Sequence, residues 1–278
     1  MEMLIEVDRS RWVELRDLYR QDWPKNVVAS SILDANISYP DLSKEFNFKV
    51  YCPDGNIQNG MVATSEKANF IRVHPLNGIE KMEEALATTK LIDWNKTINV
   101  VFASSEVDEC FERLGVRFGL KIQGTKAFKH VLHRESALVE DICPPPNTYI
   151  AEPKQEHLEI IDKAWTFHNK DSLKYFEALA RNHLLFVLYS DDGELLAWVG
   201  TDHEGHLTHL YCLEEHRKKG YAEHVLRYVV NNELKKGRDL LAYTYEHNIK
   251  PKFLFDKLNF DRFGYDRWLS ITKIINES

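Results

Sequence analysis

Three consecutive prolines, Pro144 to Pro146, interrupt the chain near its middle. Proline lacks a backbone N–H group and clashes with the preceding helical turn, so neither a helix nor a central strand continues through such a run. The surrounding stretch, EDICPPPNTY, therefore predicts a boundary between two folded parts. We expect an N-terminal α/β domain over residues 1–140, a proline-rich linker over 141–148 and a second domain over 149–278.

The first half alternates between two kinds of pattern. Runs rich in β-branched and aromatic residues predict strands, and they are FNFKVYC (46–52), NFIRVHP (69–75) and INVVFAS (98–104). Apolar residues at helical spacing predict helices over IEKMEEALATTKLI (79–92) and EVDECFERLGVRFGL (106–120). This half is therefore predicted to be α/β, and it contains no motif that indicates a particular chemistry.

The second half begins with three short strand patterns separated by glycine-containing turns. The patterns are HLLFVLYS (183–190), ELLAWVGT (194–201) and HLTHLYCL (206–213), and the turns are DDG and DHEG. Such turns between β-rich runs predict consecutive antiparallel strands. Apolar residues then recur on one helical face from Tyr221 to Leu234. A strand over DLLAYTYE, a short helix over PKFLFDKL and a final β-rich stretch, DRWLSITKI, follow.

Composition narrows the class of protein. The formal net charge is −7 at pH 7, whereas nucleic-acid and membrane-surface proteins ordinarily carry a basic excess, so we expect neither partner. The four cysteines stand singly, which indicates reduced thiols inside a cell. No apolar run approaches the roughly 18 residues of a spanning helix, and the start of the chain lacks the hydrophobic segment of a secretory signal. We expect an intracellular protein, cytoplasmic or mitochondrial.

A basic turn precedes the predicted helix of the second half, in the stretch EEHRKKGYA. Free N–H groups at the start of a helix attract anions, so cations are mildly unfavourable there. Arg217, Lys218 and Lys219 nevertheless stand at this start, which a bound anion such as pyrophosphate explains. The alternative is a solvated basic turn that its two glutamates partly balance.

The residues around this turn resemble the GNAT acyltransferase superfamily, whose central signature is R/Q-x-x-G-x-G/A. The matching residues are Arg217, Gly220 and Ala222. They follow three predicted strands and precede a helix, a strand and then Asn248 with the stretch LFDKLNF, which is the order found in that superfamily.

Within the superfamily, the chain is similar to the glycine N-acyltransferase-like branch, which carries an L-x-E-x-R-x-x-G block. The block is matched by Leu213, Glu215, Arg217 and Gly220. The motif resemblance covers residues 184–268, and over residues 1–140 it is architectural only. It implies an α/β (α+β) protein with the GNAT fold in its C-terminal half, a mixed central sheet flanked by helices, preceded by a smaller GNAT-like α/β domain.

The resemblance implies acyl-CoA as the co-substrate, with the backbone N–H groups of residues 217–222 on its pyrophosphate. The strand ending near Leu213 is expected to splay from DLLAYTYE, so that the pantetheine amides pair with its unpaired backbone groups. Asn248 matches an asparagine near the pantetheine arm, with a helix N-cap as the alternative. The predicted cofactor-binding residues are Tyr211, Cys212, Leu213, Arg217, Lys218, Lys219, Gly220, Tyr221, Ala222, Asn248 and Phe255.

Acyl transfer to an amine requires a base for the acceptor nitrogen. The strand HLTHLYCL and the turn before it offer Glu204, His206 and His209. The glycine acyltransferases are expected to use a glutamate at the start of this strand, and counting back from Arg217 puts His206 at about that position, so the base remains open among the three. Each also has a plain structural alternative: Glu204 as a solvated turn residue, and the histidines as polar strand residues. Strand alternation predicts His209 on the face of Tyr211 and His206 on the opposite face with Cys212.

The departing thiolate also needs a proton. Many superfamily members place a tyrosine in an LY-x-K-L-G-F block, but the counterpart of that tyrosine here is Phe255, which has no hydroxyl. Tyr243, Tyr245 or Tyr211 substitutes for it, or water protonates the thiolate.

The residues of the second half allow two other interpretations of function. The stretch HEGH with His209 suggests a zinc hydrolase, but a helical metal pair needs i, i+4 spacing and Gly205 marks a turn instead, so we expect no metal. Trp198 and Trp268 suggest a pocket, but aromatic residues at strand positions are more often core.

The sequence thus predicts an acyl-CoA-dependent N-acyltransferase that makes an amide with glycine or another small amino compound by direct attack in a ternary complex. Cys212 as an acyl-enzyme nucleophile is the alternative route. The rival function is a protein of the same fold that holds acyl-CoA without turnover. The acyl chain length, the acceptor and the oligomeric state are left open.

Overall fold

The computed structural model describes residues 2–65, 70–140 and 143–274. By its contacts the chain forms two compact units, the first made of Met1–Lys129, Thr244–His247 and Phe263–Ser278, and the second of His130–Tyr243 and Asn248–Arg262. The C-terminal strand therefore belongs with the first unit. The predicted domains 1–140 and 149–278 and linker 141–148 stay a prediction. Asn69 of a predicted strand, and residues 141 and 142 of the linker, lie outside the described residues.

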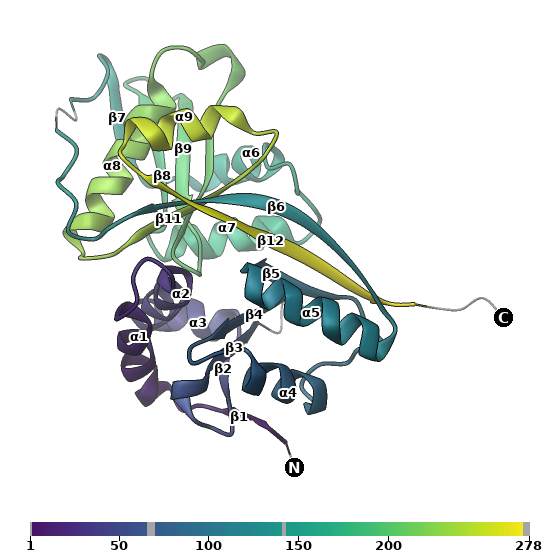
Figure 1. Cartoon of the computed structure of the whole chain (residues 1–278). Coiled ribbons are helices and arrows are strands. Elements are labelled where there is room, and N and C mark those ends of the chain that lie inside the picture. Colours follow the sequence, from purple (N-terminus) through teal and green to yellow (C-terminus); the bar gives the residue numbers. More distant parts are fainter. Residues whose placement is uncertain (1, 66–69, 141–142, 275–278) are drawn as a thin grey trace. The chain divides into compact units, whose positions relative to one another are not determined.

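The first unit is a mixed sheet with helices on both faces (Figure 1). Its helices are α1 (Trp12–Arg20), α2 (Val27–Ser38), α3 (Pro40–Glu45), α4 (Glu80–Thr88) and α5 (Ser105–Phe118). Its strands, in sheet order, are β1 (Leu4–Glu6), β2 (Phe48–Pro53), β3 (Gly60–Ser65), β4 (Phe70–Pro75), β5 (Ile98–Ala103), β12 (Asp261–Lys273) and β6 (Leu120–Leu132). The strands β1 to β4 are antiparallel, β5 runs parallel to β4, and β12 pairs antiparallel with β5.

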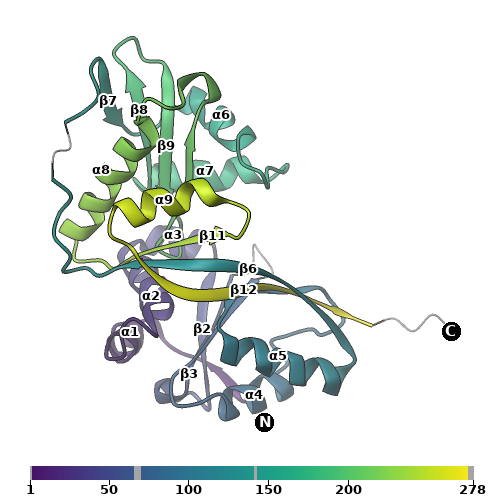
Figure 2. The same ribbon diagram turned by 45° about the horizontal axis from the view of Figure 1, so that its top comes forward.

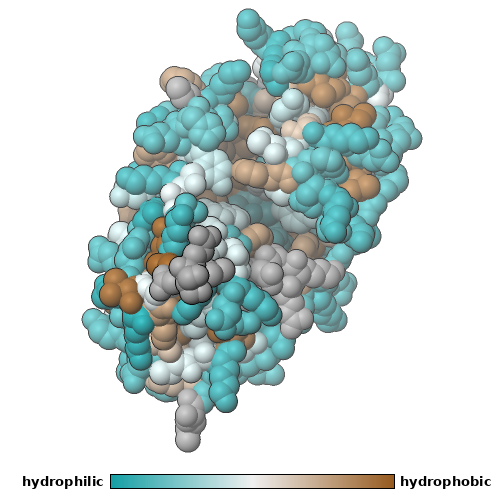
Figure 3. Space-filling model, turned by 90° about the vertical axis from the view of Figure 1, so that its right-hand side faces the viewer, coloured by the Kyte–Doolittle hydropathy of each residue, from teal (hydrophilic) through white to brown (hydrophobic). Residues whose placement is uncertain are grey.

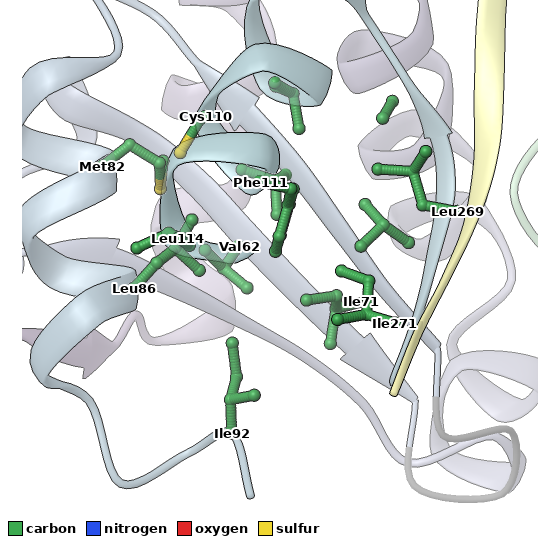
Figure 4. Close-up of a cluster of buried hydrophobic side chains, with 14 of the residues drawn as sticks. Val62, Ile71, Met82, Leu86, Ile92, Cys110, Phe111, Leu114, Leu269 and Ile271 are labelled. Carbon is green, nitrogen blue, oxygen red and sulfur yellow. The ribbon is translucent and has the colours of Figure 1, made fainter. Parts of the chain in front are cut away.

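Helices α4 and α5 cover one face of this sheet and bury its main core. Figure 4 shows Met82 and Leu86 of α4 gathered with Phe111 and Leu114 of α5 over the strands. Leu269 of β12 lies in the same cluster. Burial of each such side chain contributes roughly 1.5–3 kcal/mol, so the C-terminal strand is part of this core although it is far away in the sequence.

The second unit repeats the element order of the first. Its helices are α6 (Leu158–Lys163), α7 (Ser172–Arg181), α8 (Tyr221–Lys235) and α9 (Ile249–Lys257). Its strands, in sheet order, are β7 (Thr148–Ala151), β8 (Leu185–Ser190), β9 (Leu195–Thr201), β10 (His206–Cys212) and β11 (Leu240–Tyr245). In Figures 1 and 2, α8 and α9 lie on one face of these strands and α6 and α7 on the other.

The predicted mixed α/β fold is confirmed, and the three strands before the basic turn are antiparallel as predicted. The predicted helical face is buried in a core with β8 to β11, and its residues are Val225, Leu226, Val229, Val230 and Leu234. Several boundaries differ from prediction, and three of them matter for the description of the units. The helix predicted over 79–92 ends at Thr88, the short helix begins at Ile249 rather than at Pro251, and the final strand begins at Asp261.

The surface agrees with the charged composition. Figure 3 shows one face on which hydrophilic side chains predominate and hydrophobic ones are scattered. Within residues 2–65, 70–140 and 143–274, no helix is long and apolar enough to cross a membrane.

Candidate functional site

The basic turn lies between β10 and α8 and is open to solvent. A short 3-10 helix, Glu214–His216, leads into it, and Lys218 and Gly220 adopt left-handed backbone with φ of 64° and 80°. Gly220 is the N-cap of α8, and a Cβ built on it meets nothing within 4 Å. The turn thus brings an uncrowded stretch of backbone to the start of a helix.

Several backbone donors of this turn are available. Among the hydrogen bonds described, none uses the N–H groups of residues 218–222, and Gly220 supplies no side-chain cap. Unpaired donors at a helix start carry partial positive charge, which favours an anion. The turn therefore has the donor arrangement of an anion-binding site. We call residues 217–222 the anion cradle.

Arg217 folds back over the end of β10. Its Nε donates to the carbonyl oxygen of Cys212 at 3.2 Å, one terminal nitrogen donates to Glu214 Oε1 at 2.8 Å, and its guanidinium lies 5.4 Å from the Tyr211 ring centroid. Such exposed ion pairs contribute at most about 1 kcal/mol. Arg217 can therefore exchange Glu214 for a phosphate at little cost.

The equivalent turn of the first unit, between β4 and α4, lacks the open, positively charged surroundings of the cradle. Gly78 has the same left-handed conformation, with φ of 95°, but a Cβ at this position lies 2.6 Å from Glu80 Oε2. Glu80 and Glu83 occupy the first turn of α4. A carboxylate thus lies over the turn where the second unit offers three cations.

The strand β10 leaves part of its backbone unpaired. Its described register with β11 covers only His206 opposite Leu241 and Leu207 opposite Ala242. Its register with β9 is interrupted by a bulge between Thr208 and Tyr211. Within the second unit, β10 beyond Leu207 therefore has no described partner on its β11 side, which agrees with the predicted splay of β10 from β11.

The bulge overturns the predicted strict alternation along β10. Leu207, Leu210 and Cys212 all pack against the α8 core, although an odd and an even position cannot share a face of a regular strand. The bulge absorbs one residue and shifts the register. His206 is thereby placed on the face opposite to Cys212, where alternation predicted the same face.

His206 is buried at the start of β10 beside a carboxylate that the sequence analysis missed. Its Nδ1 lies 3.5 Å from Asp202 Oδ2, and Asp202 Oδ1 accepts the backbone N–H groups of Glu204 at 2.9 Å and His206 at 2.8 Å. Burial acts to raise the pKa of Asp202, but the interactions with His206 and His203 together outweigh it, so the pKa lies below its usual range. This is an oriented carboxylate–imidazole pair, and the spacing D-x-x-x-H across a predicted hairpin turn was its only signal.

The candidate Glu204 is not a solvated turn residue, which corrects that expectation. Its side chain is buried, and His203 Nε2 lies 3.4 Å from its Oε1. His209 is half-buried, and its ring packs against Phe176, with 4.7 Å between ring centroids. Burial lowers the pKa of His209 to about 4, against the opposing effect of Asp202. The structure therefore brings Glu204, His206 and His209 together around Asp202.

Several known proteins resemble this chain in sequence or in fold. Residues 186–269 match the family model described as FR47-like protein. The chain is 21% identical over 172 residues to human glycine N-acyltransferase-like protein 2, and 24% identical over 166 residues to bovine (Bos taurus) glycine N-phenylacetyltransferase. These matches cover 56% and 53% of the chain, and they span 58% and 56% of the relatives' own lengths.

Solved structures share the fold over the whole chain. A Drosophila protein of known crystal structure has a TM-score of 0.84 at 19% identity, with full coverage of both chains. A tandem GNAT protein from clavulanic acid biosynthesis has a TM-score of 0.55 at 13% identity, with 99% coverage of both. Together these comparisons support a GNAT-superfamily, N-acyltransferase-like protein. The predicted resemblance is confirmed.

Of the three tyrosines considered for the leaving group, Tyr243 has a described ring contact with His206, with 5.6 Å between ring centroids. Tyr211 packs on Trp198 at 4.9 Å between ring centroids. Tyr245 belongs to the first unit and stacks on His247, and burial raises its pKa.

Two predicted cofactor residues of the GNAT block lie in different surroundings. Phe255 is buried in the core of the second unit, 5.0 Å from the His130 ring and 5.1 Å from the Phe260 ring. Asn248 is exposed at the N-cap position of α9, and its side chain makes no capping hydrogen bond. Their assignment to the acyl-CoA site stays a prediction.

Cys212 lies on β10, and burial raises the pKa of its thiol, which disfavours the nucleophilic thiolate. In the part of the chain that the structure describes, no group of three or more His, Cys, Asp or Glu side chains is arranged to hold a metal ion. The candidate site consists of the cradle, the bulged strand β10 and the Asp202–His206 pair.

Proposed function

We propose that this protein is an acyl-CoA-dependent N-acyltransferase that transfers the acyl group to the amine of glycine or of another small amino compound. One observation carries the proposal: the oriented Asp202–His206 pair and the anion cradle lie at the two ends of the same strand, β10. A base at one end and a phosphate site at the other suit a long thioester that runs along the strand between them.

Acyl-CoA would be held by its charge and by its amides. The N–H groups of residues 218–222 would donate to the pyrophosphate, and Arg217, Lys218 and Lys219 would add positive charge. The unpaired backbone of β10 beyond Leu207 would pair with the pantetheine amides as an added strand.

His206 would act as the general base. With its Nδ1 facing Asp202, the neutral imidazole carries its proton on Nδ1 and leaves Nε2 as the acceptor. The amine nitrogen attacks the thioester carbonyl carbon, and Nε2 takes the proton that this nitrogen loses. The C–S bond then breaks, the amide forms, and the CoA thiolate receives a proton from Tyr243 or from water.

Direct attack of the amine on the thioester agrees with the raised pKa of Cys212. An acyl-enzyme would need the Cys212 thiolate, but burial raises the pKa of this thiol. A ternary complex needs no such nucleophile, so Cys212 serves packing.

The test compares His206→Asn with His183→Asn in an assay of amine-dependent thiol release. His183 is an exposed histidine of the second unit that also pairs with a carboxylate, Glu152. Loss of a general base lowers kcat by about 10²–10⁴-fold, so His206→Asn should lose at least about 10²-fold with acyl-CoA affinity unchanged, and His183→Asn should keep full turnover. Full turnover in His206→Asn would contradict the assignment of the base.

The same assay tests the rival function, which is acyl-CoA binding without turnover. Phe255, which is buried and has no hydroxyl, stands in place of the family tyrosine and favours this rival. A wild-type protein that binds acyl-CoA tightly and releases no thiol with any amine would be a non-catalytic binder.

A further inference from the structure

His209 has a backbone conformation that is unusual for its position. Its φ is 56°, in the left-handed region, although it lies within a strand. Residues other than glycine seldom adopt this region, although asparagine, aspartate and histidine do so more often than the others, and such a conformation persists where the surroundings impose it.

The surroundings of the His209 ring are three aromatic rings from the α6 and α7 side of the second unit. The ring centroids of Phe176, Trp165 and Tyr175 lie 4.7, 5.2 and 5.6 Å from that of His209. These rings also contact one another, with Trp165 stacked on Tyr175. We call Trp165, Tyr175 and Phe176 the aromatic clamp.

The conformation of His209 determines the path of β10. Thr208 pairs with Gly200 and Tyr211 with Trp198, so His209 and Leu210 are the two residues within the bulge. The bulge turns Leu210 into the α8 core, while the clamp holds His209 on the opposite face. The backbone that faces the open side of β10 is therefore set by how His209 is held.

The environment of His209 does not suit proton transfer near neutral pH. Burial lowers its pKa to about 4, and the nearby Asp202 only partly opposes this. An imidazole with so low a pKa is a weak base, whereas His206 has its carboxylate at ion-pair distance.

We propose that His209 is a positioning residue rather than the base: its left-handed backbone, fixed by the aromatic clamp, sets the bulge of β10 against which the thioester lies. This inference rests on the proposed acyl transfer and assigns different roles to the two histidines of the strand. Catalysis then depends on the conformation of residue 209 more than on its imidazole.

The experiment uses two substitutions at His209 that differ in backbone preference. Asparagine tolerates the left-handed region and valine resists it. His209→Asn should keep kcat within about tenfold of wild type, well short of the 10²–10⁴-fold loss expected for a general base, and His209→Val should lose substantially more. Phe176→Leu, which loosens the clamp, should lower kcat without moving the pH profile. A loss of 10²-fold or more in His209→Asn, or an altered pH profile in Phe176→Leu, would overturn the proposal.

His183 supplies the matched control, because its φ is 57° and its side chain is exposed. His183→Asn and His183→Val should both leave kcat unchanged. Thermal unfolding gives a readout that needs no activity: valine should lower the midpoint more than asparagine at both positions. Equal midpoints for the two variants at position 209 would contradict the backbone argument.

Acyl-CoA affinity separates the two possible failures. If wild type binds acyl-CoA but the affinity of His209→Val equals that of His209→Asn, the positioning role is wrong and the proposed function stands. If wild type neither binds nor transfers, the proposed function is wrong, and the unfolding comparison alone decides whether the clamp fixes the bulge.

Discussion

Replacing Asp202 with asparagine removes the charge that lies against His206 while keeping the shape of the side chain. The carboxylate of Asp202 accepts two backbone N–H groups and faces His206 Nδ1 at 3.5 Å. An asparagine can keep its oxygen on the two N–H groups, but its NH₂ group then faces Nδ1. Because two donors cannot face each other, the imidazole must move its proton to Nε2, the atom that would accept the proton of the amine.

The size of the effect follows from these contacts. Loss of the acceptor at Nε2 removes general-base catalysis, about 10²–10⁴-fold in kcat, or roughly 3–5 kcal/mol of transition-state stabilisation. Hydrogen bonds to a charged group contribute about 1.5–3 kcal/mol, so we expect the free energy of unfolding to fall by about 1–3 kcal/mol at neutral pH. Acyl-CoA affinity should not change, because the anion cradle lies at the other end of β10.

The stability difference should also depend on pH. The pKa of Asp202 lies below its ordinary value, because its hydrogen bonds and its attraction to His206 and His203 together outweigh the effect of burial. A carboxyl whose pKa is lower in the folded state stabilises the fold above its unfolded pKa of about 3.9, and that contribution is lost as the pH falls through the folded value. The gap between wild type and Asp202→Asn should therefore narrow in acid.

Steady-state kinetics and urea unfolding between neutral pH and pH 3 measure both effects. The expected result is a large fall in kcat with unchanged acyl-CoA binding, and a stability gap that closes toward low pH. Unchanged kcat in Asp202→Asn, with His206→Asn inactive, would refute the claim that the carboxylate orients the base.

Three further outcomes follow from the same geometry. Gly220→Glu should abolish acyl-CoA binding. Gly237→Glu should not, because Gly237 lies at the other end of α8, although its φ of 69° and its open surroundings are like those of Gly220. Equal loss of binding in both variants would mean that the substitutions report backbone strain rather than the cradle. Cys212→Ala should retain turnover, and intact-mass measurement should find no acylated protein in the presence of acyl-CoA alone; an acyl adduct at Cys212 would reverse the direct-attack route. Calorimetric titration should give one acyl-CoA per chain, because Glu80 occupies the equivalent turn of the first unit; two sites per chain would show that this turn is open after all.

Local signals in the sequence were sufficient for the part of the second unit from β8 to α9. Glycine-containing turns separate its three antiparallel strands, and the apolar face of α8 follows the helical period along its whole length. The Arg217 to Ala222 block then located the cradle. Each of these features depends on neighbours in the chain, so the sequence carries it directly.

Features that depend on distant contacts were not predictable in this way. The helix α2 is buried along most of its length, so it shows little amphipathic contrast, and no helix was predicted there. The pairing of β12 with β5 joins the end of the chain to the first unit, and no periodicity reports such a partner. The repeat of element order between the units is carried by topology, not by matching residues.

The candidate site was likewise predictable only in part from the sequence. The candidates His206 and His209 were found because imidazoles stand out on a strand, but a single extra residue in the bulge put His206 on the face opposite to the predicted one. Asp202 was overlooked because aspartate is ordinary in a hairpin turn. Its role depends on burial beside His206, which only the folded unit provides.

Acyl transfer at β10 can be measured directly in the wild-type protein. The protein is incubated with short, aromatic and long acyl-CoAs, each with and without glycine, mixed amino acids and small amines, while free thiol and amide product are both quantified. We expect thiol release that requires an amine and equals the amide formed. No release with any amine, together with tight acyl-CoA binding that Gly220→Glu abolishes, would contradict acyl transfer and leave a cradle that binds the thioester without chemistry.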